Sequence, residues 1–587
     1  MIKIGDKSIK SLFFNNKPFN KAYYGDKLMF KKTTTKPYFC EVEYLESTGT
    51  QYIDTGINAD SNLGFDISFK FNDLVENYTR FGAIRQTETS VYTRHHTSVP
   101  SNGATYYMGL TTRISIPTNT SINRLILDTT NNTFTANEET TQYTTDFFDC
   151  DLSYYLFARN GYLNNASSVT YAKTRIYNAK FFVSGVLVRD FIPVLDKDKV
   201  PCIYDKVNGQ FFYNQGSGEF LYGRQIHEVE YIESTGTQYI ETGYNICTST
   251  DEVELDYQLL DTTIYKWIFG EHDNNARFGV GSGDGVNKRN LAYGATTTKL
   301  TEAYLFDSKH SFKANKDGAF VDGVKFSDYK NFTSTSSIWL FNLNLSPYTY
   351  GTKTRIWKYR HKRNGILIRD YIPAVDENGK SFMFDKVSHT IFDNKGTGEF
   401  SHPLIKLKYI ESTGTQWIDT GVVLTNNHSV EIDYKITEAQ QARKGLFGGL
   451  TSKATARYGS LLSPTTNYLE HGYGAGNIYY QTELPDTKRH LLKQENNKVY
   501  IDNILIYTFN EATFTLDATA PLGNFNYTNY TPAKARYYSS RWWNGNVLIR
   551  DFIPVLDNNM KPCWYDNITG QFFYNKGSGE FLYKKGE

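Results

Sequence analysis

The sequence predicts an all-β protein in which three tandem β-sandwich domains follow a short basic N-terminal segment. A stretch of fourteen residues, EYLESTGTQYIDTG at 43–56, returns almost unchanged at 230–243 and at 408–421. Between these copies apolar and polar residues alternate with a period of two, and few segments hold the spacing of an amphipathic helix. The chain of 587 residues contains 46 tyrosines against 5 methionines, which favours sheets over helices.

A second repeated stretch closes each copy. It reads VLVRDFIP, then YDKVNGQFFYN, then GSGEF in the first copy, and its arginines Arg189, Arg369 and Arg550 are 180 and 181 residues apart. A period of about 180 residues is the size of a whole domain. We therefore expect module one at 41–223, module two at 228–400 and module three at 406–583. The joints at 223–227 and 401–405 are short, so neighbouring modules are expected to pack closely.

Residues 1–39 form a separate segment with nine lysines and two aspartates. Gly5-Asp6 and Gly25-Asp26 mark turns, and the short alternating runs beside them predict small hairpins. So short a segment cannot bury a core of its own. It is either an anchor that docks the chain onto something larger or a hairpin segment folded back on module one.

Within each module the opening stretch predicts strand, turn, strand, with Asp54 forming an Asx-type turn before Gly56. Alternating runs such as 253–257 and 430–434 predict half-buried strands, and 205–211 predicts a hairpin around Asn-Gly. Because the strictest repeats lie at the two ends of a module, we expect the first and last strands to pair.

Composition excludes several classes of function. The net charge of +1 gives no electrostatic reason for binding nucleic acid or an acidic membrane surface. The N-terminus lacks the apolar region of a signal peptide, and no run reaches the roughly 18 apolar residues that span a bilayer. The five cysteines do not recur as a set in the copies, so they are expected to be reduced thiols rather than a disulfide framework.

The opening stretch, G-x-L-I-R-D-F-I-P-V and Y-D-x-x-x-G-Q-F-F-Y-N-x-G-S-G-E-F together resemble the laminin-G-like, concanavalin A-like jelly-roll domains of bacteriophages and gut bacteria. The resemblance covers 41–583; modules one and three fit best, and module two departs at 383–385 and 391–393. It implies an appendage of a virus particle that contacts a host surface, often a glycan. It also implies attachment to other virion proteins through 1–39, and a homo-oligomer such as a trimer.

Catalytic motifs are scarce. Glu252, Glu254 and Asp256 are similar to the clustered acids of glycoside hydrolases with the same overall fold, but module one has no such set, so we interpret them as the solvent face of a strand. The Arg-Asp pairs that begin with Arg189, Arg369 and Arg550 could bind acidic sugars. Since adjacent strand residues point to opposite faces, we interpret each as a separate structural contact.

Ligand recognition is expected in the loops where the copies differ. Aromatic rings offer a face for stacking on a sugar, and planar polar groups pair with its hydroxyls. The candidates are Trp267, His272, Asp273, Asn275 and Arg277 in module two; Tyr468, Glu470, His471 and Tyr473 in module three; and Tyr92, His95 and His96 in module one. No cofactor is expected. Calcium is left open, because Asp273, Asn274 and Asp284 could supply oxygens to it without a diagnostic spacing.

The sequence thus favours a non-enzymatic virion component that displays three lectin-like domains for adhesion to a host surface or glycan. Two alternatives stay open: a carbohydrate-active enzyme or its binding module, and a bacterial surface adhesin. Which part of a virion and which ligand are involved cannot be read from the residues.

Overall fold

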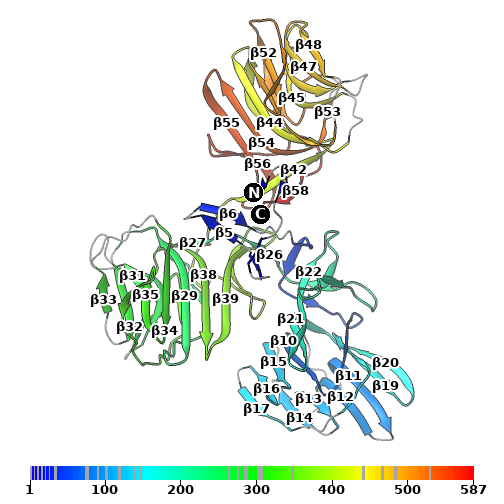
Figure 1. Ribbon diagram of the computed structural model, residues 1–587, viewed down its shortest axis with the longest axis vertical. Coiled ribbons are helices and arrows are strands. Elements are labelled where there is room, and N and C mark those ends of the chain that lie inside the picture. Colours follow the sequence, from blue (N-terminus) through cyan, green and yellow to red (C-terminus); the bar gives the residue numbers. More distant parts are fainter. Residues whose placement is uncertain are drawn as a thin grey trace. The chain divides into compact units, whose positions relative to one another are not determined.

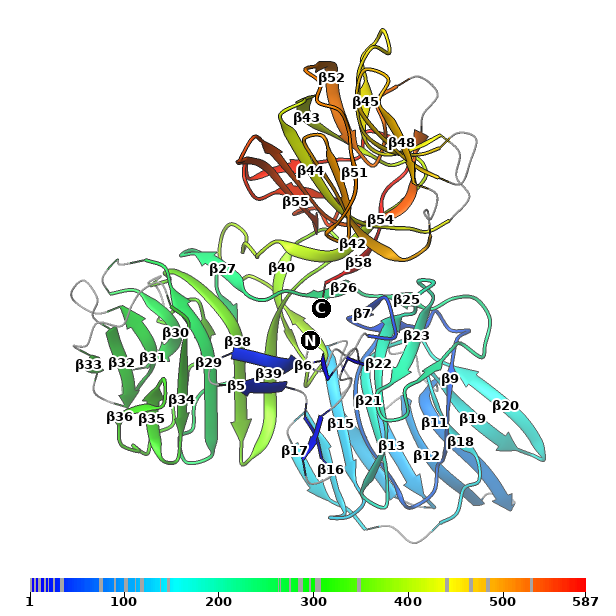
Figure 2. The ribbon, with the colours of Figure 1, turned by 45° about the horizontal axis from the view of Figure 1, so that its top comes forward.

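The fold is taken from a computed structural model (Figures 1 and 2). The structure describes residues 3–4, 7–8, 12–14, 17–19, 21–24, 27–31, 36–72, 78–88, 91–99, 104–110, 112–116, 121–137, 139–144, 148–261, 263, 265–273, 276–282, 289–294, 297–300, 308–345, 350–438, 443–463, 468–481, 486–527 and 531–586. Every regular element in these ranges is a β-strand, as predicted. Among the same residues, no helix is long and apolar enough to cross a membrane. The chain divides into two compact units, 36–403 and 404–587 with 1–35.

The N-terminal residues form short antiparallel hairpins. The strand pairs are β1 (Lys3–Ile4) with β2 (Lys7–Ser8), β3 (Leu12–Phe14) with β4 (Lys17–Phe19), and β5 (Lys21–Tyr24) with β6 (Lys27–Lys31). The first and third pairs flank Gly5-Asp6 and Gly25-Asp26, where turns were predicted. The turn residues themselves lie outside the described residues.

Module one is built from two sheets, which are antiparallel except for one parallel pair of strands in the second sheet. Its first sheet contains β7 (Cys40–Val42), β8 (Leu45–Glu46), β10 (Leu63–Phe71), β15 (Ile122–Asp128), β16 (Thr133–Ala136), β17 (Glu139–Gln142), β21 (Thr174–Val183), β22 (Val186–Leu195), β23 (Pro201–Asp205), β24 (Gln210–Phe212) and β25 (Leu221–Tyr222). The second sheet runs β14 (Thr112–Ile116), β13 (Ala104–Gly109), β12 (Val91–Val99), β11 (Tyr78–Glu88), β19 (Ala158–Leu163), β20 (Ala166–Tyr171), and β9 (Ile53–Asn58) pairs with β18 (Ser153–Leu156).

Module two repeats this plan. Its first sheet contains β27 (Ile232–Thr235), β29 (Asp251–Leu259), β34 (His310–Asn315), β35 (Gly318–Val321), β36 (Val324–Ser327), β38 (Lys353–Arg363), β39 (Ile366–Val375), β40 (Ser381–Asp385) and β41 (Thr390–Phe392). The second sheet runs β28 (Ile240–Glu241), β37 (Trp339–Leu340), β30 (Trp267–His272), β31 (Arg277–Ser282), β32 (Arg289–Gly294), β33 (Thr297–Leu300).

Module three, in the other unit, has the same two sheets. The first contains β42 (Ile405–Thr413), β44 (His428–Ile436), β49 (Arg489–Glu495), β50 (Lys498–Ile501), β51 (Ile504–Thr508), β54 (Lys534–Asn544), β55 (Val547–Leu556), β56 (Pro562–Asp566), β57 (Gln571–Phe573) and β58 (Leu582–Lys585). The second runs β43 (Ile418–Thr425), β52 (Thr515–Leu522), β45 (Lys444–Leu450), β46 (Arg457–Leu462), β47 (Leu469–Gly474), β48 (Ile478–Gln481), with β53 (Thr531–Pro532) beside β45.

The core of each sandwich follows from the period-two pattern. In module one, alternate residues of β10 such as Phe65, Ile67 and Phe69 are fully buried between the sheets. Val253, Leu255 and Tyr257 of β29, and Val430, Ile432 and Tyr434 of β44, take the same place in the other modules. Each strand therefore turns one face inward, as a sandwich requires.

The opening and closing repeats are joined in every module by one buried glutamine. In module one the backbone N–H of Thr48 donates to Gln51 Oε1 at 2.9 Å, and Gln51 Nε2 donates to the carbonyl of Glu219 at 3.0 Å. Gln238 makes the corresponding contacts in module two. In module three Gln416 Oε1 accepts the N–H of Thr413 in the same way, while its Nε2 donates to the carbonyl of Ser578, two residues before the glutamate. Close by, a Cβ at Gly216 would lie 1.9 Å from the carbonyl oxygen of Thr50, so only glycine fits there. The near-identity of the repeats is thus explained by packing.

The first and last strands of a module pair, as predicted. β8 pairs with β25 in module one and β42 pairs with β58 in module three, while in module two a single bridge joins Glu233 to Ser401. The predicted Asx turn is also present, because Asp54 accepts the N–H of Gly56 at 2.9 Å. The repeated stretch therefore closes the sandwich.

The joint between modules one and two is itself a strand, β26 (Gln225–Glu228), which pairs with β7 on one side and β39 on the other. Lys36 lies beside this joint and bridges Glu41 at 3.0 Å and Glu228 at 2.9 Å. Residues 36–39, expected in the N-terminal segment, therefore belong with module one.

Module two departs from the repeat because it contacts module one at those positions. His389 replaces the turn glycine of the other copies, takes the same left-handed conformation (φ 59°), and its Nε2 lies 3.0 Å from the carbonyl oxygen of Val42. Asp393 replaces a tyrosine and accepts two hydrogen bonds from Arg224, at 2.9 and 2.8 Å. Module two therefore differs from the other copies at His389 and Asp393 because these residues contact module one.

Candidate functional site

The segments that differ between the copies were expected to be loops, and for most of their described residues this expectation is wrong. These residues form the strands of the second sheet, β11 to β14, β30 to β33 and β45 to β48, whereas Asp273 and Tyr468 lie just outside a strand. On these strands one residue faces the core and the next faces away from it. A candidate side chain is accessible to a ligand only if it lies on the outer face, the face turned away from the core.

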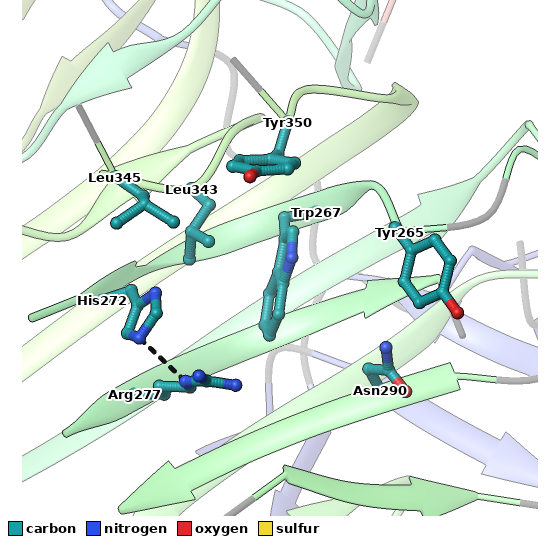
Figure 3. A pocket seen from close by; sticks show the side chains of 8 residues that line it. All are labelled: Tyr265, Trp267, His272, Arg277, Asn290, Leu343, Leu345 and Tyr350. Atoms are coloured by element: carbon teal, nitrogen blue, oxygen red, sulfur yellow. Dashed lines mark hydrogen bonds between the residues drawn. The ribbon is translucent and has the colours of Figure 1, made fainter. Parts of the chain in front are cut away.

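Module two has a concavity of about 430 Å³ on this outer face (Figure 3). Its described lining residues are Tyr265, Trp267, His272, Arg277, Asn290, Leu343, Leu345 and Tyr350. The concavity exists because the cross-strand row between its walls, Gly270, Gly279 and Ala292, carries almost no side chain. A Cβ on Gly270 or Gly279 would lie within 2.5 Å of a neighbouring carbonyl oxygen, so these two strands cross closely only as glycines.

Aromatic and aliphatic side chains form the walls. Trp267 packs with Ala292 and Leu343, and Leu345 and Tyr350 pack on the edge of this cluster. Figure 3 shows the indole standing between Tyr350 and Tyr265, with the two leucines on one side. Trp267 is 9% exposed, whereas Tyr265 is 55% exposed. The concavity therefore offers a fixed aromatic face and a more open ring at its mouth.

Three polar side chains complete the site. The Nε–H of Arg277 donates to His272 Nε2 at 2.8 Å, which leaves the proton of the neutral imidazole on Nδ1. Burial, and then the charge of Arg277, lower the pKa of His272, so the ring is neutral at pH 7. Asn290 is buried, and its Oδ1 has no hydrogen-bond partner among the described residues. A buried amide oxygen without a partner is costly, and a ligand hydroxyl would satisfy it.

This arrangement is suited to binding a small polar molecule. The volume lies in the usual range of small-molecule sites, roughly 300–1,000 Å³. An aromatic face with a few planar polar groups is what a saccharide needs. Among the described lining residues there is no carboxylate, whereas glycoside hydrolysis normally requires two.

Three module-two candidates, Trp267, His272 and Arg277, thus lie around one concavity. Asp273 does not join them: its carboxylate accepts the N–H of Ala276 at 2.7 Å and the N–H of Thr335 at 3.0 Å, so it braces a turn. Asn275 lies outside the described residues, as do Asn274 and Asp284, the other two oxygens considered for calcium. In the part of the chain that the structure describes, no three His, Cys, Asp or Glu side chains gather to hold a metal.

In module one the candidates separate by face. His95 lies in the core, fully buried among Phe65, Tyr106 and Phe148, and burial lowers its pKa to about 3. This placement does not support its proposed contact with a ligand. Tyr92 and His96 belong to the outer face.

In module three most candidates are already engaged. Glu470 forms an ion pair with Arg457 at 2.5 Å. His471 is buried, Ser460 Oγ lies 2.7 Å from its Nδ1, and burial lowers its pKa to about 4. Tyr473 packs inside the sandwich against Tyr458. Only Tyr468 stays half-exposed, so ligand binding by Glu470, His471 and Tyr473 is not supported by their placement.

Sequence reasoning named Arg277 as a candidate but missed that an arginine occupies the same outer-face position in all three modules. Each lies opposite a glycine of the following strand: Arg94 pairs with Gly109, Arg277 with Gly294 and Arg457 with Gly474. The signal was present as Arg-Phe-Gly at 277–279 and Arg-Tyr-Gly at 457–459. Module one has Arg-His-His at this place, which hid the match.

The acids considered for catalysis form a solvent-facing ladder. Glu254 lies 3.4 Å from Lys358 Nζ and 3.5 Å from Lys313 Nζ, and Asp256 lies 3.1 Å from Lys309 Nζ. Bridges of this kind on a half-exposed sheet face are structural contacts, as expected.

The Arg-Asp pairs also make separate structural contacts, as predicted. Arg550 Nε lies 3.7 Å from the fully buried Asp566, whereas its neighbour Asp551 pairs with Arg541 at 3.2 Å. Modules one and two divide their Arg-Asp contacts in the same way.

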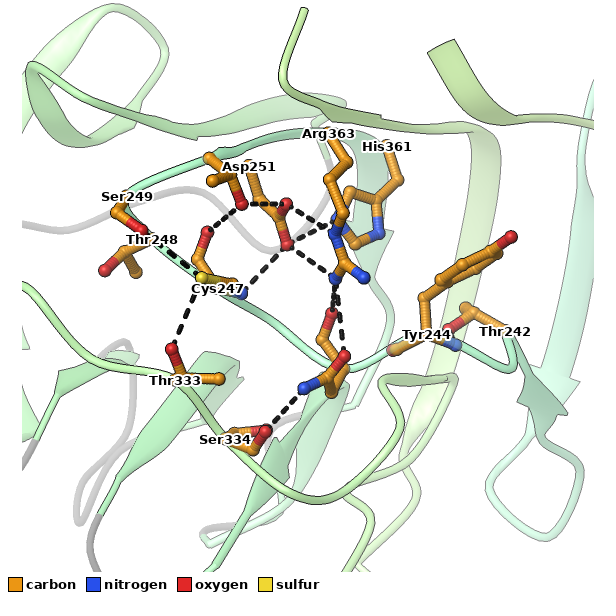
Figure 4. Close-up of polar contacts among 12 residues, drawn as sticks. Thr242, Tyr244, Cys247, Thr248, Ser249, Asp251, Thr333, Ser334, His361 and Arg363 are labelled. Atoms are coloured by element: carbon orange, nitrogen blue, oxygen red, sulfur yellow. Dashed lines mark hydrogen bonds and ion pairs between the residues drawn. The ribbon is translucent and has the colours of Figure 1, made fainter. Parts of the chain in front are cut away.

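A second polar cluster in module two contains histidine, cysteine and aspartate, residue types that are common in active sites, but its contacts are structural (Figure 4). His361 Nε2 and Arg363 Nε lie 3.0 and 2.9 Å from the carboxylate of the buried Asp251. Burial acts to raise the pKa of Asp251, but these contacts outweigh it and hold the pKa low. Cys247 lies beside them, and its Sγ contacts Ser249 and Thr333 hydroxyls at 3.3 Å, which lower its pKa to about 7. Its described contacts join the thiol to hydroxyls rather than to His361, so they form no Cys-His pair.

The comparisons with known proteins give structural likenesses only. No family model and no curated protein matches the chain. Among solved structures, the LG1-3 region of the laminin α2 chain is 10% identical, with 90% of this chain and 100% of that chain covered and a TM-score of 0.23. Domains LG4-5 of the mouse laminin α1 chain are 11% identical over 57% and 94%, with a TM-score of 0.20. A Trypanosoma rangeli sialidase in complex with 2,3-difluoro-KDN is 11% identical over 80% and 92%, with a TM-score of 0.18.

At these identities and TM-scores the likenesses carry no argument about function. The β-sandwich architecture stands on the strand pairings described above. Laminin LG regions are the kind of domain that the sequence motifs resemble, and none of these three structures is a bacteriophage protein.

Proposed function

We propose that the protein is a non-enzymatic, surface-binding protein whose module two binds a saccharide in the concavity around Trp267. The observation that carries this proposal is the combination of a fixed indole face with the amide oxygen of Asn290, which has no hydrogen-bond partner within the described residues. The ring gives a sugar an apolar face to stack on, and the amide accepts one of its hydroxyls. His272 and Arg277 hold further planar polar groups at the same edge.

The concavity is tested by measuring saccharide binding to the full-length protein. A glycan array screens for ligands, and titration calorimetry then gives the Kd for the best one. Trp267→Ala should weaken binding by roughly 2 kcal/mol, about 30-fold, because a buried aromatic anchor typically dominates a binding site. Tyr265→Ala should weaken binding less, because this ring is largely exposed.

Two controls separate binding from folding. Tyr329→Ala removes another exposed tyrosine of module two, 38% exposed and outside the concavity, and should leave the Kd unchanged. Because Tyr265 is exposed, its variant should also keep the melting profile of the wild type. Equal binding by wild type, Trp267→Ala and Tyr265→Ala would overturn the proposal.

We also propose that the chain is an appendage of a bacteriophage particle, joined to other virion proteins through its N-terminal segment and assembled as a homo-oligomer such as a trimer. This proposal is supported by the sequence motifs and by the basic hairpins at 1–31. Since Lys36 and Tyr38 pack on module one, an anchor deletion should end at residue 35. The deleted protein should stay folded and be missing from purified particles; normal incorporation would contradict the anchor.

A further inference from the structure

The outer face of the second sheet in module one carries a row of polar side chains that ends in an arginine on each side. Five neighbouring strands, β19, β11, β12, β13 and β14, each contribute one residue to this row. In that order the residues are Arg159, Gly82, His96, Tyr107 and Arg113. Paired residues of a sheet point to the same face. The five positions therefore form one continuous surface, in which Gly82 contributes no side chain between Arg159 and His96.

Contacts within this row hold its side chains in place. His96 stacks on Tyr107 with ring centroids 5.2 Å apart. The guanidinium of Arg94, from the adjacent row, lies 5.0 Å from the centre of the Tyr107 ring, and that of Arg113 lies 5.6 Å from it. The tyrosine thus sits between two cations, which an aromatic ring stabilises only in part.

Within the part of the chain that the structure describes, these cations have no counter-charge. Among the described residues, no carboxylate forms an ion pair with Arg94, Arg113 or Arg159. The Nε atoms of Arg94 and Arg159 are buried without a hydrogen-bond partner in the same part of the chain. Burial lowers the pKa of both arginines, and the charge of Arg113 lowers that of Arg94 further. Arg94 and Arg159 donate from Nη2 to the carbonyl of Leu110 and the hydroxyl of Thr170, both at 3.0 Å, but these acceptors are neutral. Positive charges that are partly removed from water without a counter-charge among the described residues favour the arrival of an anion.

His96 adds a hydrogen-bond acceptor to this surface. Its Nδ1 lies 3.2 Å from the carbonyl oxygen of Thr97 and donates to it, which leaves Nε2 as the acceptor. The side chain is only 5% exposed, and Nε2 has no partner among the described residues. Burial keeps the ring neutral by lowering its pKa to about 3. A ligand that fits all these groups carries both a negative charge and a hydroxyl donor.

The other modules show that the fold does not require these charges. In modules two and three the position of Arg159 is found from the parallel bridges Glu271–Asn344 and Gly449–Asn526, which correspond to the pairing of Ala83 with Asn160. The residue before each asparagine takes the place of Arg159, and it is Leu343 in module two and Phe525 in module three. The arginine equivalent to Arg94 is neutralised in module three, where Arg457 pairs with Glu470 at 2.5 Å. Module three therefore builds the same sheet face without this cluster of unneutralised arginines.

We propose that module one binds the anionic group of an acidic saccharide, a carboxylate or a sulfate, between Arg94, Arg113 and Arg159, with a sugar hydroxyl donated to His96. Guanidinium groups bind such planar or tetrahedral oxyanions with paired N–H donors. The saccharide as the bearer of the anion rests on the proposed function together with the acceptor on His96; the requirement for negative charge rests on the arginines alone.

The test compares oligogalacturonate, sulfated dextran oligosaccharides and uncharged dextran oligosaccharides by titration calorimetry on the full-length protein. The acidic ligands should bind, one anion class more tightly than the other, and their affinity should fall with added salt. Arg113→Gln should weaken that binding about tenfold or more, since a hydrogen bond to a charged group contributes enough for a factor of roughly 10 to 100. Arg113 is exposed, so this variant should fold normally. Arg159→Gln, checked by its melting profile, should act in the same direction.

Controls make each outcome decisive. Arg541→Gln in module three removes the same charge from a 52% exposed arginine and should change nothing. Trp267→Ala should leave acidic binding intact, so a failed concavity in module two cannot be mistaken for a failure of this site. Acidic ligands that bind no better than uncharged dextran, or equally to Arg113→Gln and wild type, would overturn the proposal. Equally tight, Arg113-dependent binding of a single-stranded oligonucleotide would overturn the saccharide as ligand.

Discussion

The buried glutamine that joins the opening and closing repeats should contribute strongly to the stability of its module. We therefore predict a large loss of stability in module three from the substitution Gln416→Ala. Gln416 is 3% exposed, and its Oε1 accepts the N–H of Thr413 at 2.8 Å and the hydroxyl of Thr413 at 3.2 Å. Its Nε2 donates to the carbonyl of Ser578 at 3.2 Å. Three hydrogen bonds at about 1 kcal/mol each give a loss of roughly 3 kcal/mol, and the groups left unpaired add to it.

Hydrogen exchange followed by mass spectrometry measures this loss inside the full-length protein. A change of about 3 kcal/mol should speed exchange in β42 and β58 roughly 100-fold, because exchange from locally open states follows their free energy. Gln571→Ala removes an exposed glutamine from the same module and serves as the matched control. If the two variants have the same exchange rates in β42 and β58, the hydrogen bonds of Gln416 do not stabilise the module.

Three further predictions concern a buried acid, a thiol and the N-terminal segment. Burial raises the folded-state pKa of Glu271 from 4.5 to about 8, so its contribution to stability is complete below pH 4.5 and is lost as the pH rises to 8. Glu271→Gln should therefore raise the melting temperature of module two at pH 8 but not at pH 4; equal shifts at both would contradict the burial argument. Cys247 should be alkylated by iodoacetamide faster than the four buried cysteines near pH 7, as peptide mapping would show, and uniform labelling would argue against its lowered pKa. Removal of 1–35 should leave the exchange pattern of 36–403 unchanged, and faster exchange around β7 would show that the hairpins support module one.

The β-sandwich architecture could be predicted from the sequence because the same patterns occur in all three copies. Period-two alternation sets the strands, and three copies of the same turn residues set the closure. Gln51 and Gly216 are retained in every copy at positions where a buried amide and a missing Cβ are required. Packing within one module explains each of these residues.

The candidate site was harder to predict, because the variable strands give no clear apolar alternation. In Tyr92 to Thr97 polar residues occupy both faces, so the adjacent His95 and His96 could not be assigned to the core and to the outer face from the sequence alone. The residues at which module two differs from the other copies could not be explained from the sequence either. His389 breaks the repeat because it contacts Val42 of module one, a residue far away in the sequence.

The Kd of the full-length protein for its best neutral saccharide, measured with and without Trp267→Ala, tests the central claim most directly. That claim is that the repeated stretches build the sandwiches while the unrepeated outer sheet faces bind ligands. It predicts binding that falls about 30-fold in the variant and is unchanged in Tyr329→Ala. Saccharide binding that survives Trp267→Ala at full strength would contradict it.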